Sequence, residues 1–359
     1  MTMLRIRVLI VEDSLTVRRR LAEVVERDPG LELCGEAADG KSAIELCQRL
    51  RPDVVSLDMM LPVMTGLAAA EHIMAYCPTP ILIVSASTNR GELFNTYDAL
   101  AAGAVDVLEK PRADDPDGAW DHQFTSRLKM TARIKVITHP RARLDAAARR
   151  ASTGPSPSLA GAARTGCRAI AIGASTGGPA AVFRILGALP PDFPVPILLV
   201  IHIAAPFDLA LAEWLDERSP LRVALARDGD ALPAQGEGRV IMAPPDWHLV
   251  LERDRLRLSS APERHSCRPS VDMLFESVAS ELRDRAAACL LTGMGRDGAQ
   301  GLLAVRCAGG ATLAQDEETS VVYGMPKEAA LLGAPERVLP LDAIAPALRA
   351  IALGEGARP

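Results

Sequence analysis

Residues 7–14 read RVLIVEDS, a short run of branched apolar residues that ends in the acidic pair Glu12 and Asp13. Short runs rich in Val, Ile and Leu are typical of parallel strands that are buried on both faces. Further runs of this kind follow, with helical segments between them, and together they predict a compact, doubly wound α/β sheet. Their sequences are LELCGEA (31–37), DVVSLD (53–58), PILIVSA (80–86) and AVDVLEK (104–110).

A second strand-helix region begins at Cys167, after a small, polar and basic stretch over residues 141–166. That stretch has no apolar period, so it is expected to be a linker. Beyond it, RAIAIGAS, PILLVIHI and AACLLTGM are predicted strands, while GRVIMAP and HLVLERDRLRLS are expected to form a β-hairpin beside the sheet. The expected boundaries are a first domain over residues 1–125, a linker over 126–165 and a second domain over 166–355.

The composition of the chain indicates a globular protein of two domains. The chain has 359 residues, of which 48% are hydrophobic, as expected for two globular domains. A net charge of −5 and an aromatic content of 3% do not favour nucleic acid or an anionic membrane as the main partner. The seven cysteines form no C-x-x-C pair and are expected to be reduced, buried thiols in a cytoplasmic protein.

The hydropathy pattern indicates neither a signal peptide nor a transmembrane helix. The N-terminus lacks the cleavage pattern of a signal peptide. The most apolar stretch, residues 193–207, is interrupted by prolines and by His202 and is shorter than the roughly 18 residues that span a bilayer. We therefore expect no membrane insertion.

Charged side chains stand at the ends of several predicted strands in the first half. Glu12 and Asp13 follow the first strand, Asp58 ends the third and Lys110 ends the fifth. Because the carboxyl ends of parallel strands meet at one edge of a sheet, these side chains should converge. The combination fits phosphoryl transfer to a carboxylate, with Asp58 as the nucleophile and the Lys110 ammonium neutralising phosphoryl oxygens.

Phosphoryl transfer of this kind uses Mg²⁺, which prefers oxygen ligands in octahedral geometry. Glu12, Asp13 and Asp58, with the backbone carbonyl of Met60, are the predicted ligands. Ser85, at the end of the fourth strand, is expected to donate a hydrogen bond to a phosphoryl oxygen. Each residue alone would more often be a strand-end cap or a solvated loop charge, so the prediction depends on their joint spacing and order.

The segments VLIVEDS, SLDMMLPVMTGL, ILIVSAS and GAVDVLEKP resemble the response-regulator receiver domain throughout residues 5–120. The resemblance implies a flavodoxin-like, five-stranded parallel sheet and phosphorylation of Asp58 by a partner histidine kinase. It also implies an activation switch through Ser85 and the position of Val107. Receivers often carry an aromatic residue where Val107 stands and an aspartate where Thr65 stands.

A glycine-rich turn, GASTGGP over residues 173–179, follows a predicted strand and opens a predicted helix. It matches G-x-S-x-G, a sharp turn that exposes a serine hydroxyl, and amides at a helix N-terminus favour an oxyanion. Ser175 is therefore a candidate nucleophile. A nucleotide-binding loop and a purely structural turn remain alternatives, although the turn lacks the G-x-G-x-x-G spacing and the lysine of a P-loop.

A serine nucleophile needs a base and a group that orients the base. His202 ends the next predicted strand, PILLVIH, and Asp297 follows a third strand in LLTGMGRDGAQG. Ser175, His202 and Asp297 form a candidate triad in which the serine attacks, the histidine transfers the proton and the aspartate fixes the tautomer. Taken singly, a strand-end histidine is more often packed, and an aspartate before glycine is more often a turn residue.

The order Ser–His–Asp differs from that of α/β-hydrolases. The segments that carry a different resemblance are IGASTGGP, IHIAAPF, MAPPDWHL, RPSVDMLFES, LTGMGRDGAQGL and QDEETSVVYGMPKEA. Over residues 168–352 they resemble the catalytic domain of the CheB family of chemotaxis protein-glutamate methylesterases. The resemblance implies a doubly wound, Rossmann-like methylesterase domain with its triad at Ser175, His202 and Asp297. It places oxyanion stabilisation near the backbone of Met294, with Thr176 lining the site.

The two resemblances together imply a phosphorylation-activated enzyme of chemosensory adaptation. It would hydrolyse glutamyl methyl esters on methyl-accepting chemoreceptors, release methanol and deamidate particular receptor glutamines, with no cofactor for the ester hydrolysis. The unphosphorylated receiver is expected to cover the esterase cleft. Two alternatives are a receiver fused to a nucleotide-binding, dehydrogenase-like domain and a receiver fused to an output domain that only binds a partner.

Overall fold

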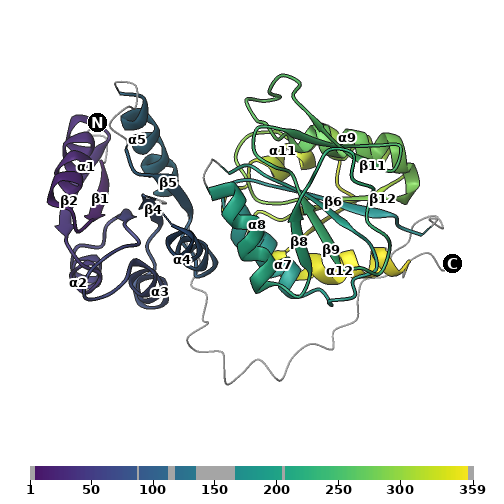
Figure 1. The fold of residues 1–359 in the computed structure, drawn as a ribbon. Helices are drawn as coiled ribbons and strands as arrows, with labels where there is room; N and C mark the ends of the chain where they lie inside the picture. Colours follow the sequence, from purple (N-terminus) through teal and green to yellow (C-terminus); the bar gives the residue numbers. More distant parts are fainter. Residues whose placement is uncertain (1–4, 87–88, 112–117, 135–165, 204–206, 355–359) are drawn as a thin grey trace. The chain divides into compact units, whose positions relative to one another are not determined.

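The structure, a computed structural model, describes residues 5–86, 89–111, 118–134, 166–203 and 207–354. The chain divides into two compact units, Met1–Gly154 and Pro155–Pro359. Each unit contains a parallel sheet with helices on both faces (Figure 1). Most of the predicted linker falls on residues 135–165, outside the described residues.

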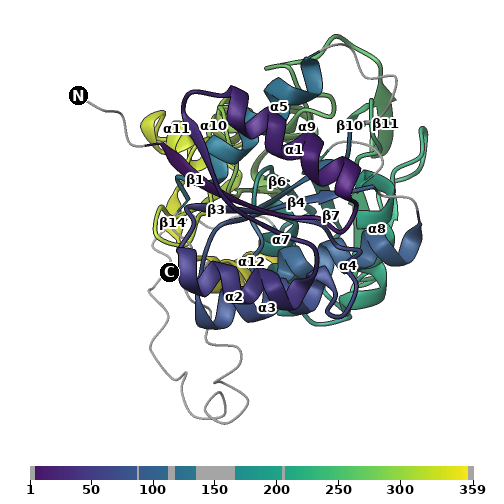
Figure 2. The ribbon, with the colours of Figure 1, turned by 90° about the vertical axis from the view of Figure 1, so that its left-hand side faces the viewer.

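The first unit has a five-stranded parallel sheet in the order β2-β1-β3-β4-β5. Helices α1 and α5 cover one face, and α2, α3 and α4 cover the other (Figure 2). This is the flavodoxin-like arrangement that the sequence predicts. The strands are β1 (Ile6–Val11), β2 (Leu31–Ala37), β3 (Val54–Leu57), β4 (Ile81–Ser85) and β5 (Asp106–Glu109), and the helices are α1 (Leu15–Arg27), α2 (Gly40–Leu50), α3 (Gly66–Tyr76), α4 (Arg90–Ala101) and α5 (Ala119–Thr131).

Local sequence signals explain where two of these helices begin. Ser14 is the N-cap of α1 and its hydroxyl accepts a hydrogen bond from Val17 N, while Thr65 caps α3 through Ala68 N. Only glycine fits at position 66, because a Cβ on Gly66 would lie 2.1 Å from the carbonyl oxygen of Asp58. The start of α3 is thereby packed directly against the backbone of the predicted phosphorylation site.

The second unit has a seven-stranded parallel sheet in the order β14-β13-β12-β6-β7-β9-β8. Helices α9, α10 and α11 pack together on one face, and α7, α8 and α12 lie on the other (Figure 1). The strands are β6 (Ala169–Ala174), β7 (Ile197–Ile201), β8 (Arg222–Leu225), β9 (Arg239–Met242), β12 (Ala286–Leu290), β13 (Ala311–Gln315) and β14 (Arg337–Leu339). The helices are α7 (Gly178–Gly187), α8 (Phe207–Arg218), α9 (Val271–Leu282), α10 (Ala299–Cys307), α11 (Met325–Leu331) and α12 (Leu341–Leu353), with a short 3-10 turn at Arg283–Arg285.

The predicted hairpin is only partly correct. GRVIMAP contains β9, which lies between β7 and β8 in the main sheet and runs parallel to both. The hairpin lies entirely within HLVLERDRLRLS, where β10 (His248–Glu252) pairs antiparallel with β11 (Arg255–Ser259). The apolar residues 240–242 are buried, as suits a strand in a sheet that is covered on both faces, but a run this short also fits a hairpin strand.

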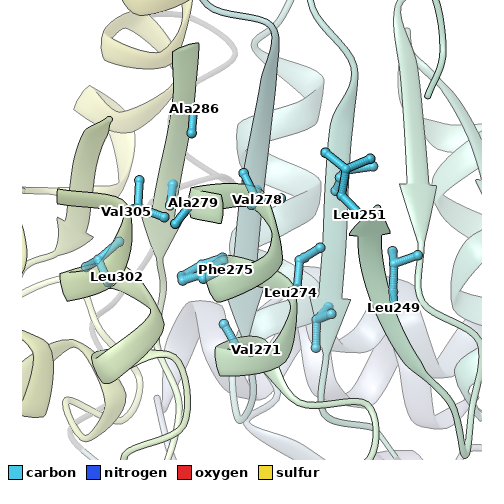
Figure 3. Packing of buried hydrophobic residues seen from close by; sticks show 14 of the residues in the cluster. Leu249, Leu251, Val271, Leu274, Phe275, Val278, Ala279, Ala286, Leu302 and Val305 are labelled. Atoms are coloured by element: carbon cyan, nitrogen blue, oxygen red, sulfur yellow. The ribbon is translucent and has the colours of Figure 1, made fainter. Parts of the chain in front are cut away.

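The apolar face of α9 forms the centre of the second core. Val271, Leu274, Phe275 and Val278 point toward the main sheet, and Leu249 of the hairpin packs into the same cluster (Figure 3). All of these side chains are buried. The hairpin and α9 therefore form one rigid cover, and the N-terminus of α9 is held over the carboxyl edge of the sheet.

The first unit has a separate core in which the strands pack against α1 and α5 through side chains such as Leu21, Phe124 and Leu128. Among the helices of the described ranges, none is both long enough and apolar enough to cross a membrane.

Candidate active site and phosphorylation site

The acidic residues at the ends of β1 and β3 come together as predicted. One carboxylate oxygen from each of Glu12, Asp13 and Asp58 lies within 4.8 Å of the others. Lys110, which follows β5, places Nζ 2.9 Å from Asp58 Oδ2 and 2.8 Å from Glu12 Oε2. Glu12 and Asp58 are buried, whereas Asp13 is exposed. The four side chains therefore form one charged cluster that opens to solvent on the side of Asp13.

This cluster carries more negative charge than its lysine compensates. Burial raises the pKa of Glu12 to about 7, although Lys110 opposes the rise. Burial likewise raises the pKa of Asp58 despite the neighbouring ammonium. Within the described ranges, Asp58 Oδ1 is a buried oxygen without a well-formed hydrogen bond. A hard divalent cation with oxygen ligands would both compensate the excess negative charge and bind the unpaired Asp58 oxygen. The donor set therefore fits Mg²⁺.

Ser85 forms a hydrogen bond with a residue that the sequence analysis did not predict to be part of the site. Its hydroxyl donates a 2.5 Å hydrogen bond to Oε1 of Glu92, in the first turn of α4, and both residues are buried. The hydroxyl therefore points to α4 in this structure. Its predicted bond to a phosphoryl oxygen stays a prediction, as does a switch involving the buried Val107.

The turn after β6 presents Ser175 at the edge of the second sheet. Gly177 adopts φ 77° as the N-cap of α7, and Gly178 N donates to the carbonyl of Ser175 at 2.7 Å. Gly293 packs against the other side, since a Cβ there would lie 2.7 Å from Ser175 Cβ. Glycines on both sides of the turn thus leave room for a half-buried serine hydroxyl at the N-terminus of a helix.

His202 and Asp297 meet beside this turn. The strands β6 and β7 are paired up to Ala174 and Ile201, and His202 N donates to the carbonyl of Ala174 at 3.0 Å. His202 Nε2 lies 2.9 Å from Asp297 Oδ2, as the predicted triad requires. No hydrogen bond joins Ser175 Oγ to the imidazole within the described ranges. Because Nε2 is occupied by Asp297, Nδ1 is the nitrogen left to accept a proton.

Asp297 is bound at the N-terminus of α9. Its Oδ1 accepts hydrogen bonds from Ser270 Oγ at 2.7 Å and Asp272 N at 3.1 Å, and its Oδ2 accepts one from Val271 N at 2.6 Å. Burial raises the pKa of Asp297, but His202 and these donors outweigh it, and the pKa lies below its usual range. The carboxylate therefore stays ionised while almost completely buried. Ser270 was not predicted, although an N-cap serine before VDMLFES is a recognisable signal.

The environment of His202 favours the imidazolium. Burial lowers the pKa of His202, but the hydrogen bond to Asp297 and the contact with Cys267 raise it, with a net result of about 9. Cys267 Sγ lies 3.7 Å from Nδ1. Cys267 was expected to be a reduced, buried thiol, but it is partly exposed, and no sequence signal placed it beside the histidine.

Thr176 follows Ser175 in the turn, and Met294 follows Gly293, which packs against Ser175, while their roles at the site stay predictions. Thr292, which is fully buried, holds their loops in place: its Oγ1 donates to the carbonyl of Thr176 at 2.9 Å and accepts from Val322 N at 2.9 Å. Its own amide donates to Gln315 Oε1 at 2.9 Å. The side chain of Met294 is exposed, so only its backbone can contribute to a fixed oxyanion site. Thr292 and Gln315 were not predicted.

Known proteins match both units. The family described as CheB methylesterase matches residues 170–348, and the family described as response regulator receiver domain matches residues 8–116. The chain is 46% identical over 347 residues to protein-glutamate methylesterase/protein-glutamine glutaminase 2 of Anaeromyxobacter dehalogenans, covering 96% of each chain. This chain belongs to the CheB methylesterase family.

Other members of the CheB family show the same extent of similarity. Protein-glutamate methylesterase/protein-glutamine glutaminase 1 of Xanthomonas campestris is 41% identical over 359 residues, which covers 98% of each chain. Among solved structures, the CheB methylesterase catalytic domain of Thermotoga maritima is 36% identical, with a TM-score of 0.49, and covers 52% of this chain and 98% of that chain. Family membership decides against the dehydrogenase-like alternative.

Proposed function

We propose that this chain is a phosphorylation-activated protein-glutamate methylesterase that also deamidates particular glutamines on methyl-accepting chemoreceptors. The observation that carries the proposal is the convergence of Ser175, His202 and Asp297 at the ends of neighbouring strands. The similarity over 96% of the chain to an enzyme named for both activities supports it. The exposed side chain of Met294 suits a substrate that is itself a protein side chain.

The geometry supports acyl transfer in two steps. Ser175 Oγ attacks the γ-carbonyl carbon of a glutamyl methyl ester, and His202 Nδ1 accepts the hydroxyl proton. The resulting oxyanion is stabilised by backbone N–H groups near Met294 and at the N-terminus of α7. The carbon–oxygen bond to the methoxy group breaks, His202 returns the proton, and methanol leaves.

Water completes the reaction. His202 takes a proton from the water as it attacks the acyl-enzyme, and the proton returns to Ser175 when the free glutamate is released. Asp297 stays ionised throughout because α9 supplies its hydrogen bonds, and it stabilises the imidazolium that forms in each step. A glutamine side chain follows the same course with ammonia as the leaving group. Neither course needs a metal or an organic cofactor.

The receiver unit supplies the control. In the proposal a chemotaxis histidine kinase donates a phosphoryl group to Asp58, and Glu12, Asp13, Asp58 and the Met60 carbonyl hold the Mg²⁺ that neutralises the transferred oxygens. Lys110 Nζ, already beside Asp58, binds the same oxygens. Phosphorylation then shifts the population toward an arrangement in which the esterase cleft is open.

The domain boundaries and the cellular location remain part of the proposal. The family matches over residues 8–116 and 170–348 support a receiver at 1–125, a linker at 126–165 and a catalytic domain at 166–355. The boundary at residue 125 falls too early, because α5 continues to Thr131 and Leu128 is buried in the core of the first unit. The seven cysteines are all free thiols, which suits a reducing cytoplasm.

The decisive experiment measures methanol release from methylated receptor membranes, with and without acetyl phosphate. Wild type, Ser175→Ala and Asp58→Asn are compared, and circular dichroism checks that each is folded. We expect acetyl phosphate to stimulate wild type, Ser175→Ala to be inactive under both conditions, and Asp58→Asn to keep only the unstimulated rate. Activity in Ser175→Ala would assign the nucleophile elsewhere, and an inactive wild type would favour an output domain that only binds.

A further inference from the structure

A thiol lies beside His202 at the ring nitrogen that is not bound to Asp297. Cys267 Sγ is 3.7 Å from His202 Nδ1, the nitrogen that Asp297 leaves open. Both side chains are partly exposed, and Cys267 is a free cysteine. A thiol has no role in the acyl transfer described above, so the pairing of sulfur and imidazole nitrogen needs its own account.

The spacing of the two atoms suits a zinc ion. Zinc bonds to imidazole nitrogen at about 2.0–2.1 Å and to thiolate sulfur at about 2.3 Å, so a tetrahedral ion separates them by roughly 3.5–3.6 Å. The observed 3.7 Å differs from this by a few tenths of an ångström at most.

Asp297 completes the pattern without being a ligand. Each of its oxygens already accepts two hydrogen bonds: Oδ1 from Ser270 Oγ and Asp272 N, and Oδ2 from Val271 N and His202 Nε2. A carboxylate that accepts the second ring N–H of a histidine orients that histidine for metal binding and increases its basicity. The bond between His202 and Asp297 therefore prepares Nδ1 for a cation as well as for a proton.

A neighbouring cluster does not share these properties. His265 Nε2 lies 3.2 Å from Asp272 Oδ2, but Arg296 Nε donates to His265 Nδ1 at 3.2 Å and the Arg264 guanidinium lies 3.6 Å from Asp272. Two cationic groups already compensate that pair. At His202 and Cys267, by contrast, no arginine or lysine of the described ranges contacts either side chain.

We propose that His202 Nδ1 and Cys267 Sγ bind Zn²⁺, and that the bound ion holds the methylesterase inactive by occupying the nitrogen that must accept the Ser175 proton. Cys267 and the His202 imidazolium each give one proton to solvent when the thiolate–zinc and nitrogen–zinc bonds form. Water fills the remaining coordination positions. With two protein ligands the site is an exchangeable, inhibitory one and not a structural zinc site. The inhibitory part rests on the proposed role of His202, whereas the binding part does not.

Binding is tested first, by a readout that needs no enzymatic activity. Co²⁺ is titrated into the full chain in the presence of excess Mg²⁺, and the thiolate-to-cobalt absorption in the near ultraviolet is recorded. Cobalt among the oxygen ligands of the receiver gives no such band. We expect the band in wild type, its loss on adding Zn²⁺, and its absence in Cys267→Ser and His202→Gln. Cys307→Ser removes an exposed cysteine in another part of the unit and should keep the band.

Inhibition is tested next, by methanol release from methylated receptors with acetyl phosphate, each variant being compared with its own metal-free rate. We expect micromolar Zn²⁺ to inhibit wild type and Cys307→Ser, a chelator to restore both, and Cys267→Ser to need at least about tenfold more zinc for the same inhibition. An unchanged cobalt band or unchanged zinc sensitivity in Cys267→Ser would overturn the proposal.

The two proposals fail in different ways. A wild type that shows the Cys267-dependent band but releases no methanol would refute the methylesterase function and leave the metal site standing. An active wild type without the band, or with the band but without zinc inhibition, would refute the inhibitory site and leave the methylesterase standing.

Discussion

The hydrogen bond from Ser270 to Asp297 allows a sharp test of how the triad is held. Ser270→Ala removes the hydroxyl that donates to Asp297 Oδ1 at 2.7 Å and that also caps α9 through Met273 N. The amides of Val271 and Asp272 still bind the carboxylate. The substitution should therefore loosen the aspartate without releasing it.

The expected magnitudes follow from these contacts. A hydrogen bond to a charged acceptor contributes about 1.5–3 kcal/mol, and an N-cap serine contributes about 1 kcal/mol. Because Asp297 keeps two amide donors, we expect the free energy of unfolding to fall by about 2 kcal/mol, or roughly 4–8 °C in Tm. Half of the lost hydrogen-bond energy is about 0.75–1.5 kcal/mol. If that half is lost from the transition state in which the imidazolium forms, kcat/KM falls about four- to twelvefold, since about 1.4 kcal/mol corresponds to a factor of ten.

Ser277→Ala is the matched control. Ser277 lies on the same helix and its hydroxyl accepts from Leu251 N at 2.9 Å and donates to the Leu274 carbonyl at 2.7 Å, away from Asp297. Its loss should cost about 1–3 kcal/mol of stability because it leaves a buried amide unpaired. Kinetics of methanol release and thermal unfolding are measured for both variants. A wild-type kcat/KM in Ser270→Ala, or an equal loss in Ser277→Ala, would refute the positioning role.

Three further predictions test other parts of the structure. Because a general base must be neutral and the pKa of His202 is raised to about 9, kcat/KM should rise about tenfold per pH unit between pH 6 and 8, and a plateau by pH 7 in a pH–rate profile would contradict this. Gly293→Ala would place a Cβ 2.7 Å from Ser175 Cβ and should lower kcat about 10²-fold by displacing the nucleophile, which steady-state kinetics on a folded variant would show. Glu92→Gln should weaken the hydrogen bond from the Ser85 hydroxyl by about 1 kcal/mol, so that about fivefold less acetyl phosphate gives half-maximal stimulation. An unchanged titration curve would argue against this hydrogen bond as a restraint on Ser85.

The sequence predicts those parts of the fold that depend on one local pattern. Strands buried on both faces appear as continuous apolar runs, and parallel strands present their carboxyl ends at one edge. This is why Asp58 and Lys110 could be brought together, and His202 and Asp297 likewise, from positions far apart in the chain. The misplaced strand β9 shows the limit, since RVIM fits a hairpin and a central strand equally well until its neighbours are known.

Residues that act on the site from other layers of the fold were missed for a related reason. Cys267 and Ser270 belong to the loop that leads into α9, and that loop reaches the sheet edge only because α9 packs its apolar face across the strands. Glu92 resembles any acidic residue in a first helical turn, and nothing in its neighbourhood along the chain indicates Ser85 as its partner. Such contacts are set by tertiary packing, which leaves no periodic trace in the sequence.

The positions of the catalytic groups and their protonation states depend on different parts of the fold. The strand-end rule places His202 next to Asp297, but a buried carboxylate would by itself gain a proton and lose its hold on the imidazole. It stays ionised because the N-terminus of α9 supplies two amides and the Ser270 hydroxyl. The sheet therefore determines the positions of the triad, while the N-terminus of α9 determines the charge of Asp297. Variants of the α9 N-terminus should consequently change the pH dependence of the reaction, whereas variants at the strand ends should abolish the reaction itself.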